Sequence, residues 1–146
     1  MQLGFALRDV PLRLVTGAYI LHAGIGKWSG DDDTAKAIHG MAAGAYPVFA
    51  SMEPKSFLRL LAAGEIGTGA ALLTPVVSTA KAGAALTGFS GALLGLYAKT
   101  PGMRKPGSIW PSPQGTAVSK DSWLFAIGLA LLVDSLTGRR RHHSDD

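Results

Sequence analysis

Long segments almost free of charged residues alternate with polar segments along the chain. Four such segments, each dominated by apolar and small residues, cover residues 10–28, 57–77, 80–98 and 118–136. An α-helix needs about 20 apolar residues to cross a bilayer core about 30 Å thick. The pattern therefore predicts an all-α fold, an integral membrane four-helix bundle in a single domain.

The connections between these segments differ in length and composition. The connection around Pro75 is short, so the second and third segments are expected to form an antiparallel hairpin. Residues 29–56 open with three aspartates, which suit a helix N-terminus, and predict a short interfacial helix ending before Pro47. Residues 99–121 are rich in proline, glycine and serine and are expected to form a loop, followed after the last span by a basic tail over 137–146.

The composition favours a membrane protein and excludes several kinds of chemistry. Hydrophobic residues make up 47% of the 146 residues, and 19 residues are glycine. The mean hydropathy is +0.23. The chain has no cysteine, which excludes disulfides, thiolate nucleophiles and cysteine-ligated iron–sulfur clusters. The sequence pI is about 9.6, but the basic residues flank the apolar segments and suit anionic lipid headgroups better than nucleic acid.

An even number of spans places both ends of the chain on one side of the membrane. Arg8, Arg13 and the cluster 139–141 lie on that side, which predicts cytoplasmic N- and C-termini. Basic residues of the second long loop lie on the other side and reduce this asymmetry. The first segment continues into Lys27 without a small-residue cleavage site, so it is expected to be a retained span and not a signal peptide.

The three tryptophans are predicted to share the outer side of the membrane. Trp28 ends the first segment, Trp110 lies in the second long loop, and Trp123 lies near the start of the last span. Indole rings favour the headgroup region of a bilayer. We expect this outer face, with both long loops, to be a docking surface for other proteins.

Glu65 is an acidic residue in the middle of an apolar segment. It follows Phe57 by eight residues, so at about 1.5 Å per residue it lies about 12 Å inside the bilayer, near its middle. An ionised carboxylate there costs about 3 kcal/mol on insertion scales, so it needs a partner, a proton or water. On the first segment, His22 lies at a matching depth, and Lys27 is shallower with a flexible stem that can reach inward.

The sequence leaves the role of Glu65 open between two hypotheses. Glu65 either forms a structural hydrogen bond or salt bridge that fixes the helix register, or it serves proton or ligand chemistry. A lone His22 suits a hydrogen-bonded core position better than a metal site, and the remaining histidines do not complete a metal-binding group with it. Near the opposite surface, a second charge pair is expected between Arg13 and Asp134.

Helical phase and small residues predict how the spans pack. Five positions of the first segment are spaced by four, three, four and three residues and therefore form one stripe, comprising Arg13, Gly17, Ile20, Gly24 and Lys27. His22 lies on a different stripe. Small residues also surround Glu65 and recur through the third segment, where they let helix backbones approach closely in lipid. We therefore expect a tightly packed bundle.

The order of these features resembles the DoxX family of small membrane proteins. The first segment resembles the family's opening motif at Arg13, Gly17, Gly24 and Lys27, and the second resembles its glutamate followed by small residues, at Glu65, Gly67 and Gly69. Pro47 matches a proline that the family often carries, and residues 119–134 are similar to the final helix of some members. His22 and the long loop over 99–121 depart from the family pattern.

The resemblance implies a bacterial cell membrane protein, similar to the small membrane subunit of a thiosulfate:quinone oxidoreductase. We expect an accessory subunit or scaffold of a larger redox or respiratory membrane complex, without catalytic residues of its own, that contacts lipids and other membrane proteins and is able to form homo-oligomers. A first alternative is binding of a quinone, haem or lipid between the spans, around Glu65, His22 and Lys27. A second alternative is a proton or small-solute conduit.

Overall fold

The computed structural model describes residues 6–143, and this part of the chain contains helices and turns but no strand. The long helices are α1 (Val10–Trp28), α3 (Pro54–Leu73), α4 (Thr79–Lys99) and α6 (Asp121–His143). The shorter elements are α2 (Asp32–Ala45), α5 (Thr116–Ser119) and the 3-10 turns η1 (Leu7–Asp9) and η2 (Pro47–Phe49). The prediction of an all-α fold is confirmed.

Local sequence signals set the ends of these helices. The Asp31 carboxylate caps α2 by accepting a hydrogen bond from the Thr34 backbone N–H at 2.8 Å, so the acidic run does begin a helix. Pro54 occupies the first turn of α3, where its missing N–H costs nothing, so α3 begins before residue 57. The same helix ends at Leu73, ahead of Pro75.

The last helix is longer than the sequence pattern predicts. α6 runs to His143, past the expected end of the span at residue 136. No proline follows Leu136, and the glycine at position 138 is tolerated within a helix at about 1 kcal/mol. Much of the predicted basic tail therefore continues the helix, and residues 144–146 of that tail lie outside the described part of the chain.

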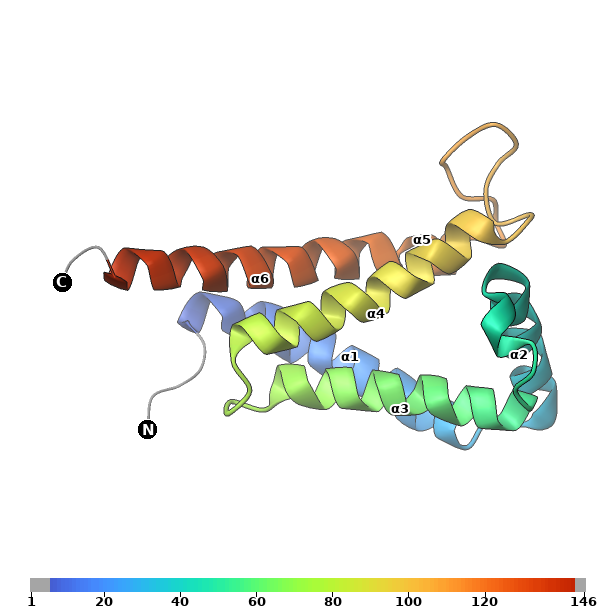
Figure 1. Ribbon diagram of the computed structural model, residues 1–146, viewed down its shortest axis with the longest axis horizontal. Helices are drawn as coiled ribbons and strands as arrows, with labels where there is room; N and C mark the ends of the chain where they lie inside the picture. Colours follow the sequence, from blue (N-terminus) through green and yellow to red (C-terminus); the bar gives the residue numbers. More distant parts are fainter. Residues whose placement is uncertain (1–5, 144–146) are drawn as a thin grey trace.

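Figure 1 shows that α1, α3, α4 and α6 run along the length of the molecule. The short helix α2 crosses the end at which α1 finishes and α3 begins, the arrangement expected of a helix that lies along a membrane surface. The start of α1 and the end of α6 lie at the opposite end of the molecule (Figure 1).

The closest helix packing occurs within two pairs, α1 with α3 and α4 with α6. In the first pair, a Cβ atom added to Gly69 would lie 2.7 Å from the Leu21 backbone nitrogen, and one added to Gly24 would lie 2.9 Å from the Glu65 Cβ. In the second pair, a Cβ atom at Gly83 would lie 2.9 Å from the Leu132 backbone nitrogen. Glycine is therefore required for the close contact within each pair.

The contact between the two pairs is looser than the contact within them. α3 and α4 are consecutive and antiparallel, as expected for a hairpin, but each packs more closely with another helix than they pack together. A small core joins the pairs through Ile20, Leu72, Leu86 and Leu131. The expected tight packing is found within the pairs but not between them, where large side chains such as Phe89 separate the helices.

Two of the described helical segments are long and apolar enough to cross a membrane, Pro54–Leu73 and Thr116–Gly138. α1 and α4 are not among these segments; α1 contains Arg13 and Lys27, and α4 contains Lys81, Lys99 and several glycines, which lower the mean hydropathy. This finding gives weak support for membrane association. The four-span membrane bundle stays a prediction.

Candidate functional site

Glu65 and Lys27 form an ion pair between α3 and α1. The Lys27 Nζ lies 3.0 Å from the Glu65 Oε1 and 3.1 Å from the Oε2, so one ammonium group contacts both carboxylate oxygens. The Glu65 side chain is 8% exposed and that of Lys27 is 29% exposed. Gly24, one turn before Lys27, brings the two backbones close enough for the lysine stem to reach inward. The predicted basic partner of Glu65 is therefore Lys27.

His22 does not take part in this site. It is exposed, whereas Gly24 and Ile20 on the same helix are buried against the rest of the molecule. Four members of the predicted stripe of α1 are buried, namely Arg13, Gly17, Ile20 and Gly24, and the fifth, Lys27, is partly buried. His22 has a depth similar to that of Glu65 along its helix but points in a different direction, since it belongs to another stripe.

A cavity of about 600 Å³ lies between the two helix pairs, and we call it the interpair cavity. Each of the helices α1 to α6 contributes to its wall, and the lining is mostly apolar. Aromatic side chains form much of this wall, at Tyr46, Phe49, Phe57 and Phe89. Tyr19 also lines it and is 76% exposed, so the cavity reaches the surface of the protein there.

The charged groups of the interpair cavity are Lys27, Glu65 and Asp121, contributed by α1, α3 and the start of α6. Asp121 is partly buried and interacts electrostatically with both members of the ion pair. No described residue donates a hydrogen bond to its carboxylate. The sequence pattern placed Asp121 at the end of a loop, so its approach to Glu65 could not be predicted without the pairing of α4 with α6.

Arg13 binds the end of α3, far from the interpair cavity along α1. Its guanidinium group donates hydrogen bonds to the backbone carbonyls of Leu72 at 2.8 Å, Ala71 at 3.0 Å, Thr74 at 3.0 Å and Val77 at 2.9 Å. The last carbonyls of a helix have no partner within the helix. Arg13 is 3% exposed and acts as a cap for α3 supplied by a different helix.

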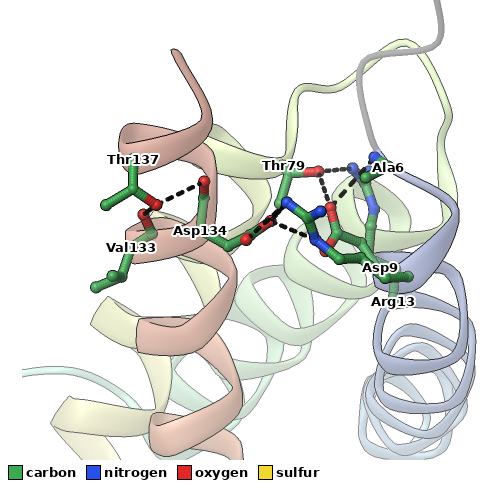
Figure 2. A network of polar contacts seen from close by, with 8 residues as sticks. Ala6, Asp9, Arg13, Thr79, Val133, Asp134 and Thr137 are labelled. Carbon is green, nitrogen blue, oxygen red and sulfur yellow. Dashed lines mark hydrogen bonds and ion pairs between the residues drawn. The ribbon is translucent and has the colours of Figure 1, made fainter. Parts of the chain in front are cut away.

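The expected pairing of Arg13 with Asp134 is wrong in its basic partner. Asp134 on α6 instead forms an ion pair with Arg8 at 2.7 Å, and this hydrogen-bonded carboxylate raises the pKa of Arg8 above its usual value. Arg8 lies in η1, just before α1, and its side chain reaches Asp134 on α6. Arg13 lies within α1 and its side chain contacts the end of α3. Figure 2 shows the polar contacts at this end of the molecule, with Asp134 on α6 and with Arg13, Asp9 and Thr79 close together. The Thr79 hydroxyl donates a hydrogen bond to the Asp9 carboxylate at 3.3 Å.

The three tryptophans are exposed and belong to segments at one end of the molecule. Trp28 is 52% exposed, Trp110 69% and Trp123 67%. Trp28 ends α1, Trp123 lies in the first turn of α6, and Trp110 lies in the loop between α4 and α5 (Figure 1). That loop is ordered by hydrogen bonds, from the Tyr97 hydroxyl to the Ile109 carbonyl at 2.7 Å and from the Lys105 N–H to the Trp110 carbonyl at 2.9 Å.

No group of three or more metal-ligating side chains occurs within the part of the chain that the structure describes. His39 lies in α2 and makes a structural contact, with its Nε2 2.8 Å from the Phe49 carbonyl oxygen. Comparison with known proteins identifies no relative, because no protein-family model, curated protein or solved structure matches this chain. The resemblance to the DoxX family therefore stays a prediction.

Proposed function

We propose that this chain is a multi-pass membrane protein that binds a largely apolar ligand, of the lipid or quinone class, in the interpair cavity. The observation that carries this proposal is the apolar cavity of about 600 Å³ with the Lys27–Glu65 pair in its wall. Ligand sites in proteins have volumes of about 300–1,000 Å³, with apolar walls and a few polar groups that fix orientation. The cavity has both properties.

The outward faces of the helices support the membrane setting. Leu129, Val133 and Leu136 of α6 are 39%, 55% and 51% exposed. Val15 of α1 is 67% exposed and Ile25 is 57% exposed. A helix in the core of a soluble protein would bury such residues, whereas a spanning helix presents them to lipid. An apolar ligand would then enter from the bilayer, past Tyr19.

Two of the alternatives from the sequence fit the geometry less well. Haem is disfavoured because no described histidine lines the interpair cavity and His22 is exposed elsewhere on α1. A continuous aqueous conduit is disfavoured because the buried core of Ile20, Leu72, Leu86 and Leu131 separates the cavity from the Arg13 end. A cavity that ends at a packed core suits binding more than transport.

The proposal is tested by identifying what copurifies with the full chain. The protein is purified from its own membranes in lipid nanodiscs, the bound molecules are extracted, and their amounts per protein are measured by mass spectrometry. We expect one apolar molecule to be enriched, and to be lost in the variant Ala23→Phe, which places a large side chain in the cavity. Gly26→Ala is the control, since a Cβ atom there meets nothing within 4 Å.

Equal amounts of every extracted lipid in the parent protein and in Ala23→Phe would contradict ligand binding in the cavity. Circular dichroism must show the same helix content in both proteins for the comparison to hold. Because the Gly26→Ala change lies on the same helix as Ala23, it also controls for a general effect of substitutions in α1.

A second candidate function is that of an accessory subunit docked through its ordered outer loop. Ile109 is 78% exposed and Trp110 is 69% exposed, although hydrogen bonds hold both backbones in place. Rigid, exposed apolar side chains suit a protein interface. Crosslinking in membranes followed by mass spectrometry should recover a partner, and the double variant Ile109→Ser/Trp110→Ser should lose it while keeping the bound ligand. Recovery of the same partner by this variant would rule out docking through the loop.

A further inference from the structure

The interpair cavity has one more acidic than basic side chain in its wall. The described residues that line it include two carboxylates, Glu65 and Asp121, and one ammonium group, Lys27. Glu65 and Lys27 satisfy each other, since the Lys27 Nζ contacts both oxygens of Glu65 within 3.1 Å. Asp121 is the remaining charge. A carboxylate has about four sites that accept hydrogen bonds, and those of Asp121 receive none from the described residues.

Asp121 forms no ion pair with a described lysine or arginine, although the exposed Lys120 precedes it in the chain. Lys27 is the basic residue in the cavity wall, and its ammonium group is engaged by Glu65. Tyr46 lines the same cavity, but its hydroxyl donates to the Ala92 carbonyl at 2.7 Å. Val118 and Leu124, three residues before and after Asp121, are apolar members of the cavity wall.

We infer that the ligand of the interpair cavity is an amphiphile with a cationic, hydrogen-bond-donating head, a primary ammonium group, that binds Asp121 while its tail follows the aromatic wall. This inference rests on the proposed function, because it gives the chemistry of the ligand in the same cavity. A charge-assisted hydrogen bond to a carboxylate is stronger than a neutral one, and it is strengthened further where water is scarce. An anionic head would meet the excess negative charge of Glu65 and Asp121. A quinone ring, which only accepts hydrogen bonds, could not donate one to the Asp121 carboxylate.

The inference is tested with three ligands that share one tail. The full chain in nanodiscs of zwitterionic lipid is titrated with dodecylamine, 1-dodecanol and dodecanoate, and saturable one-to-one complexes are counted by native mass spectrometry. Empty nanodiscs correct for partition into lipid. We expect dodecylamine to bind at least tenfold more tightly than dodecanoate, with dodecanol between them.

Three variants locate the selectivity. Asp121→Asn keeps the shape of the side chain and should reduce the preference for the amine to less than about threefold. Asp121→Glu keeps the charge and should retain the preference. Asp134→Asn removes a carboxylate from the same helix at its other end, where it pairs with Arg8, and should leave the selectivity unchanged.

The possible outcomes separate the inference from the proposed function. If none of the three ligands binds saturably, ligand binding in the cavity is wrong and the inference fails with it. If all three bind but dodecanoate or dodecanol binds as tightly as the amine, the cavity binds ligands and only the inferred head group is wrong. If Asp121→Asn keeps the full preference for the amine, Asp121 is not the group that recognises the ligand, and the inference is overturned.

Discussion

Replacing Gly69 by alanine tests the close approach of α1 and α3. The added Cβ atom would lie 2.7 Å from the Leu21 backbone nitrogen, 2.9 Å from the Leu21 Cα and 2.9 Å from the Gly17 carbonyl oxygen. All three atoms belong to the backbone of α1, so no side chain can rotate out of the way. The two helices must separate, and the contacts around Gly17 and Gly24 loosen with them.

The size of the effect follows from two opposing contributions. Overpacking of a close contact costs about 1–3 kcal/mol, and rigid backbone atoms place Gly69→Ala near the upper end of that range. Alanine in a helix interior is favoured over glycine by about 0.5–1 kcal/mol, which offsets part of the cost. We expect a net loss of about 2 kcal/mol in the free energy of unfolding.

Gly67→Ala is the matched control on the same helix. A Cβ atom at Gly67 meets nothing within 4 Å, so this variant should gain about 0.5–1 kcal/mol from helix propensity alone. Unfolding in mixed micelles with increasing denaturing detergent, followed by circular dichroism, should therefore separate the two variants by about 3 kcal/mol. Equal stability of Gly69→Ala and Gly67→Ala would refute the close contact between α1 and α3.

Three further predictions concern the ion pair, the loop and the cap of α2. Lys27→Met leaves the Glu65 carboxylate buried without its cation and should cost about 3 kcal/mol in unfolding free energy, most of it regained in the double variant Lys27→Met/Glu65→Leu. Tyr97→Phe removes the hydrogen bond to the Ile109 carbonyl and should cost about 1 kcal/mol, with faster hydrogen exchange confined to the loop between α4 and α5. The backbone N–H of Thr34 lowers the pKa of Asp31, so its capping contribution is complete above about pH 4 and is lost as the pH falls through the lowered pKa. A titration followed by the Thr34 amide resonance should show this loss, whereas in Asp31→Ser the same resonance should not respond over that range.

The periodicity of the sequence predicts the buried face of α1 well. Spacings of three and four residues placed Arg13, Gly17, Ile20, Gly24 and Lys27 on one stripe. The first four are buried in the structure and Lys27 is partly buried. Depth in the bilayer placed the partner of Glu65 on the first segment and left two candidates, His22 and Lys27. Depth along the helix could not decide between His22 and Lys27, because direction around the helix and the reach of the lysine stem also matter.

Pairings between distant helices could not be predicted in the same way. The Arg13–Asp134 expectation rested on both residues lying near one surface, but Arg8 reaches Asp134 and Arg13 caps α3. Likewise, Asp121 belongs to the cavity because α6 packs with α4. Small residues occur on several helix faces, so the sequence alone does not determine which face of one helix packs against which other helix.

The different residues at the helix contacts give a physical reason for the interpair cavity. Within each pair, glycines at positions such as 69 and 83 allow backbone-to-backbone contact. Between the pairs, Phe89 of α4 lies against Gly64 of α3, at about 3.5 Å from the site of an added Cβ atom, and Tyr46 reaches α4 to donate to the Ala92 carbonyl. Aromatic rings hold α3 and α4 further apart than glycines would. A bound apolar tail would supply the packing contacts that the two pairs do not make with each other, so ligand binding and cohesion of the pairs should depend on the same residues.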